Sequence, residues 1–172
     1  NNVISHNDST GEAGGIALWA SSSIVTNNTI SFNRATSGIG ISVHGGAPVI
    51  QSNIISDNTQ FFGFGGTGGG GISVIGESTA QILDNIIIDN TVSAGPGGGI
   101  TLFSAGTPTI RGNTIRGNTA GSGDGGGIWI VNLSNPSIVQ NLIVGNTAKD
   151  PRGFGRGGGV FWMLPSVRGP LL

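Results

Sequence analysis

The sequence feature that most constrains the fold is a recurring asparagine pair, Asn-x-[Val/Ile]-x-x-Asn. The pair occurs six times, and the first asparagines of successive pairs are 26, 25, 32, 28 and 28 residues apart. The pairs are Asn2/Asn7, Asn28/Asn33, Asn53/Asn58, Asn85/Asn90, Asn113/Asn118 and Asn141/Asn146. A repeat of this length indicates stacked units, each of which cannot bury its apolar residues alone. We call each unit a rung.

Apolar residues recur at fixed places in every rung with the spacing of β-strands. One lies between the two asparagines, two more follow a glycine-rich loop, and a fourth precedes the next pair. In the fifth rung they are Ile115, Ile128, Ile130 and Ile138, and the fourth residue of the first rung is Ile24. Most are β-branched, and no stretch has helical spacing. Three short strands per rung are therefore predicted.

Stacking these rungs places strands of neighbouring rungs parallel, about 4.8 Å apart, and buries the apolar residues in one column. The predicted fold is all-β: a single-stranded parallel β-helix of about six rungs, right-handed because parallel crossovers are right-handed. Residues 1–172 are predicted to form one domain, with 159–172 as a frayed end or a cap. Because the pattern opens inside a rung, we expect a fragment of a longer protein, or a mature or trimmed form.

The paired asparagines are predicted to form a ladder along the column. An inward asparagine at a strand end can bond its own turn and stack on the asparagine of the next rung, and it tolerates left-handed backbone. Twelve of the 16 asparagines occupy these two positions.

Composition excludes several classes of function. Charged residues make up 9% of the chain and the net charge is −1, so no basic stripe is present to bind nucleic acid. No run of 18 apolar residues occurs, which predicts no membrane span. There is no Cys. A surface poor in charge and rich in Asn, Ser and Thr is typical of secreted bacterial proteins, so an extracellular or cell-surface location is expected.

The repeats resemble those of the right-handed parallel β-helix proteins of the pectate-lyase-like superfamily. The closer similarity is to the polymorphic outer-membrane and adhesin type, in which a Gly-Gly-x-Ile box pairs with a Phe-x-x-Asn box. Here the first box reads GGGI at 97–100 and 125–128, and the second has Ile or Val in place of Phe, as in IIDN at 87–90. The resemblance covers nearly all of 1–164. It implies the fold and leaves the activity open, because the superfamily holds lyases, hydrolases, esterases, epimerases, tail spikes and adhesins.

Two carboxylates and an arginine are the candidate catalytic residues. Asp57 and Asp89 precede the second asparagine of neighbouring rungs, and Arg116 lies on the next rung. Such groups suit acid–base or nucleophilic chemistry on a sugar. The resemblance implies the same trio, since pectin methylesterases use one, but their flanking motifs are absent. The alternative is a solvated Asp pair beside an Arg.

Outward aromatic residues are the candidate ligand- or partner-binding residues. Trp129 and Phe161 occupy one row of the second predicted strand, and Trp19 and Phe103 occupy the neighbouring row at the bend. Aromatic rings on a flat sheet stack on sugar rings or mark an interface. The alternative is that the bend row turns inward and belongs to the core.

Two other features concern partners. The outward side of the first strand is apolar, as at Ile54 and Ile86, and the column ends are open, so self-association through either is a further prediction. Function is most easily added on long loops, here 59–71 with Phe61, Phe62 and Phe64, and 147–159 with Phe154. Mere tolerance of insertion explains these loops equally well.

No cofactor is predicted, and Ca²⁺ is the one candidate ion. Asp84 could bind a cation, and Asp124 in GSGDGGG is similar to calcium-binding Gly/Asp repeats, although it does not repeat. Two functions follow from these residues. The favoured one is a non-catalytic extracellular module that recognises polysaccharide or cell-surface glycan, or serves as a stalk. The alternative is a carbohydrate-active esterase, hydrolase or lyase.

Overall fold

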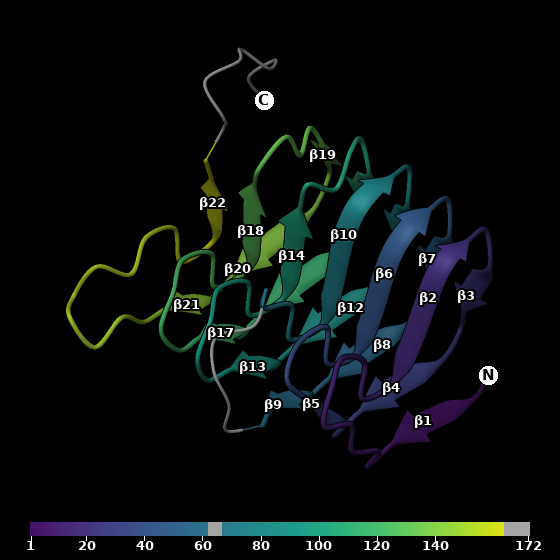
Figure 1. The fold of residues 1–172 in the computed structure, drawn as a ribbon, viewed down its shortest axis with the longest axis horizontal. Helices are drawn as coiled ribbons and strands as arrows, with labels where there is room; N and C mark the ends of the chain where they lie inside the picture. Colours follow the sequence, from purple (N-terminus) through teal and green to yellow (C-terminus); the bar gives the residue numbers. More distant parts are fainter. Residues whose placement is uncertain (62–66, 164–172) are drawn as a thin grey trace.

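A computed structural model describes residues 1–61 and 67–163. Phe62, Phe64 and the part 164–172 of the expected frayed end or cap lie outside the described residues. The described residues form 22 strands and no helix, and all paired strands are parallel. Strands of successive rungs lie side by side along one column (Figure 1). The predicted all-β architecture of six stacked rungs is confirmed.

Four parallel sheets run along the column. The first sheet contains β1 (Val3–Ser5), β4 (Thr29–Ser31), β8 (Ile54–Ser56), β12 (Ile86–Ile88), β16 (Thr114–Arg116) and β20 (Leu142–Val144). The second contains β2 (Ile16–Ser21), β6 (Ile41–Gly46), β10 (Ile72–Ser78), β14 (Ile100–Phe103), β18 (Ile128–Val131) and β22 (Val160–Trp162). The third contains β3 (Ile24–Thr26), β7 (Val49–Gln51), β11 (Gln81–Leu83), β15 (Thr109–Arg111) and β19 (Ser137–Val139).

A fourth, short sheet, which was not predicted, adds one strand to each of the second to sixth rungs. It contains β5 (Arg34–Ala35), β9 (Thr59–Gln60), β13 (Thr91–Val92), β17 (Thr119–Ala120) and β21 (Thr147–Ala148). Each of these strands has two residues and directly follows the second ladder asparagine. A two-residue strand is too short to carry an alternating apolar pattern, so periodicity does not predict it.

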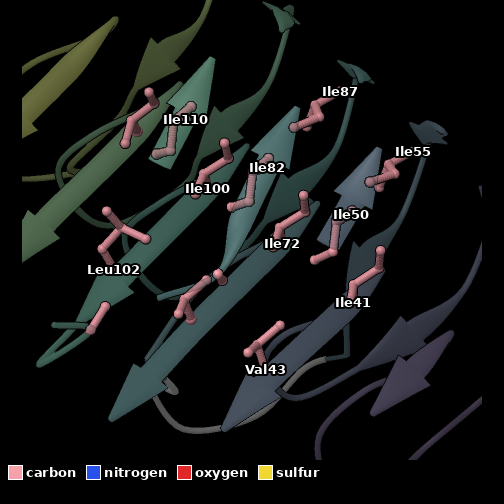
Figure 2. Packing of buried hydrophobic residues seen from close by; sticks show 14 of the residues in the cluster. Ile41, Val43, Ile50, Ile55, Ile72, Ile82, Ile87, Ile100, Leu102 and Ile110 are labelled. Atoms are coloured by element: carbon pink, nitrogen blue, oxygen red, sulfur yellow. The ribbon is translucent and has the colours of Figure 1, made fainter. Parts of the chain in front are cut away.

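The core is a stack of aliphatic side chains held in strict register. In the second sheet the residues that pair from rung to rung are Ile41, Ile72, Ile100 and Ile128. In the first sheet the isoleucines that lie between the two asparagines of each pair stack in the same way. Most of these side chains are fully buried, and they point into the space between the sheets (Figure 2). The predicted apolar column is therefore the core of the protein.

The prediction of one core residue, Ile24, is wrong. Ile24 is 71% exposed, whereas its neighbour Val25 is 8% exposed and pairs in register with Ile50. In the other rungs with a strand in the third sheet, the core residue lies three positions before the first asparagine of the next pair. In the first rung Val25 has that place. A shift of one residue moves a strand side chain to the opposite face.

The asparagine ladder is present in both predicted columns. From the second rung onward, each ladder amide oxygen accepts two bonds from the asparagine of the preceding rung, one from its backbone N–H and one from its Nδ2. In these rungs each Nδ2 also donates to a backbone carbonyl, as Asn90 does to Ile55 at 2.9 Å. The left-handed backbone lies one residue earlier, at Asp84 and Asp89 with φ of 53° and 55°. The ladder residues themselves are absent from the described residues with positive φ.

The glycine-rich boxes fold back over the start of the second sheet. At Gly97, where φ is 66°, an added Cβ would lie 1.8 Å from Thr101 Oγ1 on the outward side of β14. At Gly69, where φ is 79°, an added Cβ would lie 2.7 Å from the Ser73 Cβ on β10. As a result the outward hydroxyls of Ser73 and Thr101 are buried, and neither has a hydrogen-bond partner among residues 1–61 and 67–163.

Candidate functional site

Three of the four predicted aromatic residues gather on the outward side of the second sheet. Trp129 on β18 pairs in register with Phe161 on β22, and the ring of Phe103 on β14 stacks on Trp129 at 6.3 Å between centroids. All three side chains are half-buried, and their strand neighbours Ile128 and Ile130 point into the core. We call Phe103, Trp129 and Phe161 the aromatic patch. Phe103 therefore faces outward rather than into the core.

Arg156 completes the edge of this patch. Its guanidinium carbon lies 4.8 Å from the ring centroid of Phe161. Asp124 holds the guanidinium there, because Arg156 Nε donates to Oδ1 at 3.2 Å and Nη2 donates to Oδ2 at 2.8 Å. These hydrogen bonds raise the pKa of Arg156 above its ordinary value. The patch thus combines flat apolar rings with one fixed, exposed cation.

Arg156 and Asp124 were missed as a site in the sequence, although a signal was present. Asp124 lies four positions before Ile128, and Arg156 lies four positions before Val160, the corresponding residue of the next rung. Residues at equal places in successive rungs become neighbours in a stacked column. An Asp and an Arg at such places predict an ion pair between loops.

The loop 147–159 extends the patch away from the column, between β21 and β22 (Figure 1). Arg156, Gly153, Phe154 and Gly155 line an open concavity of about 440 Å³. Phe154 is exposed at its surface. Lys149 lines a second concavity of the same size together with other residues of this loop. The aromatic patch and the loop are continuous through Arg156.

An ion pair within the loop fixes its conformation. Arg152 donates to Asp150 through Nε at 3.1 Å and through Nη2 at 3.0 Å. The side-chain hydrogen bonds from Arg152, followed by the bond from its backbone N–H, hold the pKa of Asp150 below its ordinary value. The guanidinium of Arg152 points to solvent while the carboxylate is largely covered. Cations therefore dominate the outer surface of this loop.

The predicted catalytic residues lie at a corner of the first sheet. Asp57 and Asp89 occupy the same place on neighbouring rungs, with φ of 56° and 55°, and Gly117 and Gly145 take that place in the next two rungs. Arg116 is exposed on β16 and pairs in register with Ile88. No ion pair within 4 Å joins Arg116 to either carboxylate among the described residues. The corner thus places the two Asp residues on neighbouring rungs, and Arg116 lies beside Asp89 in the next rung, where its carbonyl accepts a hydrogen bond from the Asp89 backbone N–H at 3.1 Å.

The left-handed backbone gives these Asp residues a structural reason to be there. Asp and Gly both adopt positive φ more readily than most residues, and this corner requires it in every rung. Asp84 lies at the equivalent corner before the other ladder column, where Gln51 Nε2 donates to it at 3.4 Å.

Trp19, the fourth predicted aromatic, lies at the opposite end of the second sheet. Its ring stacks on His44 at 4.1 Å between centroids with an interplanar angle of 3°. The structure does not bring Trp19 together with the aromatic patch.

The first sheet carries the predicted outward apolar side chains. Ile54 and Ile86 are exposed at its middle, and Leu142 and Val144 are exposed on β20. The predicted facing of this strand is therefore correct. Self-association through this face, or through the ends of the column, stays a prediction.

Within 1–61 and 67–163, no three His, Asp or Glu side chains gather into a group that could hold a metal ion. The candidate calcium residue Asp124 instead has both carboxylate oxygens bonded to Arg156. The same part of the chain contains no helix of the length and hydropathy that a membrane span needs.

Stacked parallel rungs with two asparagine ladders define a parallel β-solenoid protein. A family model described as a right-handed β-helix region matches residues 1–115. The chain belongs to the right-handed β-helix family, as the sequence pattern predicted. Neither the comparison with curated proteins nor the comparison with solved structures gave a match. Family membership defines the scaffold, and the function has to be argued from the surface that the scaffold presents.

Proposed function

We propose that this protein is a non-catalytic extracellular module that recognises polysaccharide or cell-surface glycan through the aromatic patch. The observation that carries the proposal is the placement of Trp129 and Phe161 in register on neighbouring strands, with Phe103 stacked on Trp129 and the guanidinium of Arg156 over Phe161. An adhesin-like or stalk-forming role in a larger assembly is consistent with this reading.

The chemistry of the patch suits sugars. Aromatic side chains present flat apolar faces on which the C–H face of a sugar ring can pack. A guanidinium offers several N–H donors in a fixed plane, which suit hydroxyl and carboxylate oxygens. Both kinds of group are held by the column and by Asp124 before any ligand arrives, so little conformational entropy is lost on binding.

The spacing of the rungs also favours an extended ligand. Trp129 and Phe161 lie on successive rungs, roughly 4.8 Å apart along the column. A polymer lying along the column axis meets one ring after another. This arrangement favours a polysaccharide chain over a single free sugar.

Affinity electrophoresis in gels containing hydroxyethylcellulose, xylan, galactomannan or polygalacturonate tests the proposal. At least one of these polymers should retard the wild-type protein, and Trp129→Ala/Phe161→Ala should remove the retardation. The matched control is Phe32→Ala, which removes an exposed aromatic side chain at the corner of the first sheet. Retardation that survives in the double variant, or no retardation in any gel, would contradict the proposal.

Turnover of the same polymers separates the recognition module from an enzyme. The wild type and Asp57→Asn/Asp89→Asn should both leave the polymers intact and be retarded equally. Turnover by the wild type that the Asp variant lacks would instead establish a carbohydrate-active enzyme with its site at the first-sheet corner. If neither binding nor turnover occurs, sedimentation velocity would show whether the column self-associates.

A further inference from the structure

A second flat aromatic surface lies at the far end of the sheet that carries the aromatic patch. Trp19 on β2 pairs in register with His44 on β6, and the two rings are nearly coplanar in their stack, at 3° and 4.1 Å. Trp19 is 66% exposed, so the indole face turned away from His44 meets solvent.

His44 is fixed by two further contacts, which orient the indole in turn. Its Nε2 is hydrogen-bonded to the Glu12 carboxylate and lies 3.2 Å from Ser42 Oγ. The Ser42 hydroxyl also donates to Glu12 at 3.2 Å and is buried, whereas the Glu12 carboxylate is partly exposed. Because Ser42 and Glu12 meet the same imidazole nitrogen, and Ser42 is buried, the three residues do not form a nucleophile–base relay.

This surface lies in line with the aromatic patch. Trp19, His44, Ile75 and Phe103 pair in register from β2 to β14, so they form one outward row along the column. Three rung steps separate Trp19 from Phe103, which is roughly 14 Å at the spacing of parallel strands. A chain-like ligand lying along this row would reach both ends at once.

We infer that Trp19 is a second saccharide-binding platform, with the exposed Glu12 carboxylate accepting hydrogen bonds from hydroxyls of the sugar that stacks on it. The inference rests on the proposed function and adds the ligand class, a glycan chain long enough to span from Trp19 to Phe103. His44 is a positioning residue, because it acts through the indole that it supports. Two linked platforms bind a long chain more tightly than either binds alone.

Calorimetric titration with the hexasaccharide and the disaccharide of the polymer that retards the wild type most tests this inference. The hexasaccharide should bind Trp19→Ala at least about tenfold more weakly than the wild type, because one of two linked sites is lost. The disaccharide should bind the wild type at two sites and Trp19→Ala at one. His44→Ala should weaken hexasaccharide binding, and His44→Phe, which keeps a ring beside the indole but loses the contacts with Glu12 and Ser42, should bind more tightly than His44→Ala.

The outcomes distinguish the two proposals. If Trp129→Ala loses hexasaccharide binding while Trp19→Ala binds like the wild type, the second platform is overturned and the proposed function stands. If no gel retards the wild type, both fall. Phe32→Ala, which removes an exposed aromatic side chain on another sheet, should bind like the wild type throughout.

Discussion

Asn58 and Asn90, on neighbouring rungs, are joined by two hydrogen bonds to a single oxygen. Asn58 Nδ2 donates to Asn90 Oδ1 at 2.9 Å, and the backbone N–H of Asn58 donates to the same oxygen at 3.1 Å. Both asparagines are fully buried. Since buried amide groups are costly to leave unpaired, the ladder makes each rung depend on the next for its polar groups as well as its apolar ones.

The first prediction is that the centre of the ladder stabilises the column far more than its edge. Asn90→Ala leaves two buried donors of Asn58 without an acceptor and should lower the free energy of unfolding by about 3 kcal/mol. Asn2→Ala, at the exposed edge, removes only the Nδ2 donor to Asn28 Oδ1 and keeps the backbone N–H bond to the same oxygen, so it should cost less than about 1 kcal/mol. Urea unfolding measures both. Equal costs for the two variants would show that the ladder contributes little.

A second prediction concerns the glycine boxes. Gly97→Ala combines a strained φ with a Cβ 1.8 Å from Thr101 Oγ1, whereas Gly76→Ala has a similar φ of 74° and nothing within 4 Å of the added Cβ. Gly76→Ala should cost about 1 kcal/mol from backbone strain alone. Gly97→Ala should lower the free energy of unfolding at least twice as much. The decrease in the midpoint of thermal unfolding compares the two variants. If the two variants have the same melting temperature, the glycine box that contains Gly97 does not fold over β14 in solution.

A third prediction uses the hydroxyl of Thr101, which has no hydrogen-bond partner in the described part of the chain. Replacing a buried hydroxyl that lacks a partner by a methyl group of similar shape removes a desolvation cost, so Thr101→Val should raise the free energy of unfolding by about 1 kcal/mol. Ser42→Ala is the control, because the Ser42 hydroxyl is bonded and its loss should be destabilising. A destabilised Thr101→Val would mean that the hydroxyl has a partner in solution.

The pH dependence of the loop 147–159 follows from Asp150. The Arg152 hydrogen bonds lower the pKa of this carboxyl, so the pair stabilises the loop above the ordinary carboxyl range and the contribution is lost as pH falls through the lowered pKa. In Arg152→Ala the carboxyl should titrate at a higher pH than in the wild type, followed by ¹³C NMR. Arg116→Ala, which removes an exposed arginine outside the ion pairs of the described residues, should leave the titration unchanged. An unaltered midpoint in Arg152→Ala would rule out the pair.

The rung pattern was predictable from sequence because it depends on local spacing and strict register. Ile115, Ile128 and Ile130 recur at equal places in every rung, and their burial follows from stacking alone. Residue type alone places Ile24 in the core, whereas the distance from Asn28 places Val25 there, and Val25 is the buried residue.

The surface was less predictable, because it depends on how loops fold over the column. Nothing in the local sequence shows that Gly97 lies on Thr101. The pairing of Asp124 with Arg156 can be predicted only when the loops of successive rungs are aligned with each other. Aromatic residues at equal places in successive rungs did predict the pairing of Trp129 with Phe161. Trp19 lies apart from Trp129 and Phe161 because it belongs to the first rung.

The indole NMR signals of the three tryptophans test the central claim most directly. Trp129 lies in the aromatic patch, whereas Trp162 packs against the core with its Nε1 buried. The ¹⁵N-labelled protein is titrated with the hexasaccharide of the polymer that retards the wild type most. This titration should shift the Trp129 indole signal in a saturable way and leave the Trp162 indole signal in place. A protein that binds the hexasaccharide with an unmoved Trp129 signal would contradict recognition through the aromatic patch.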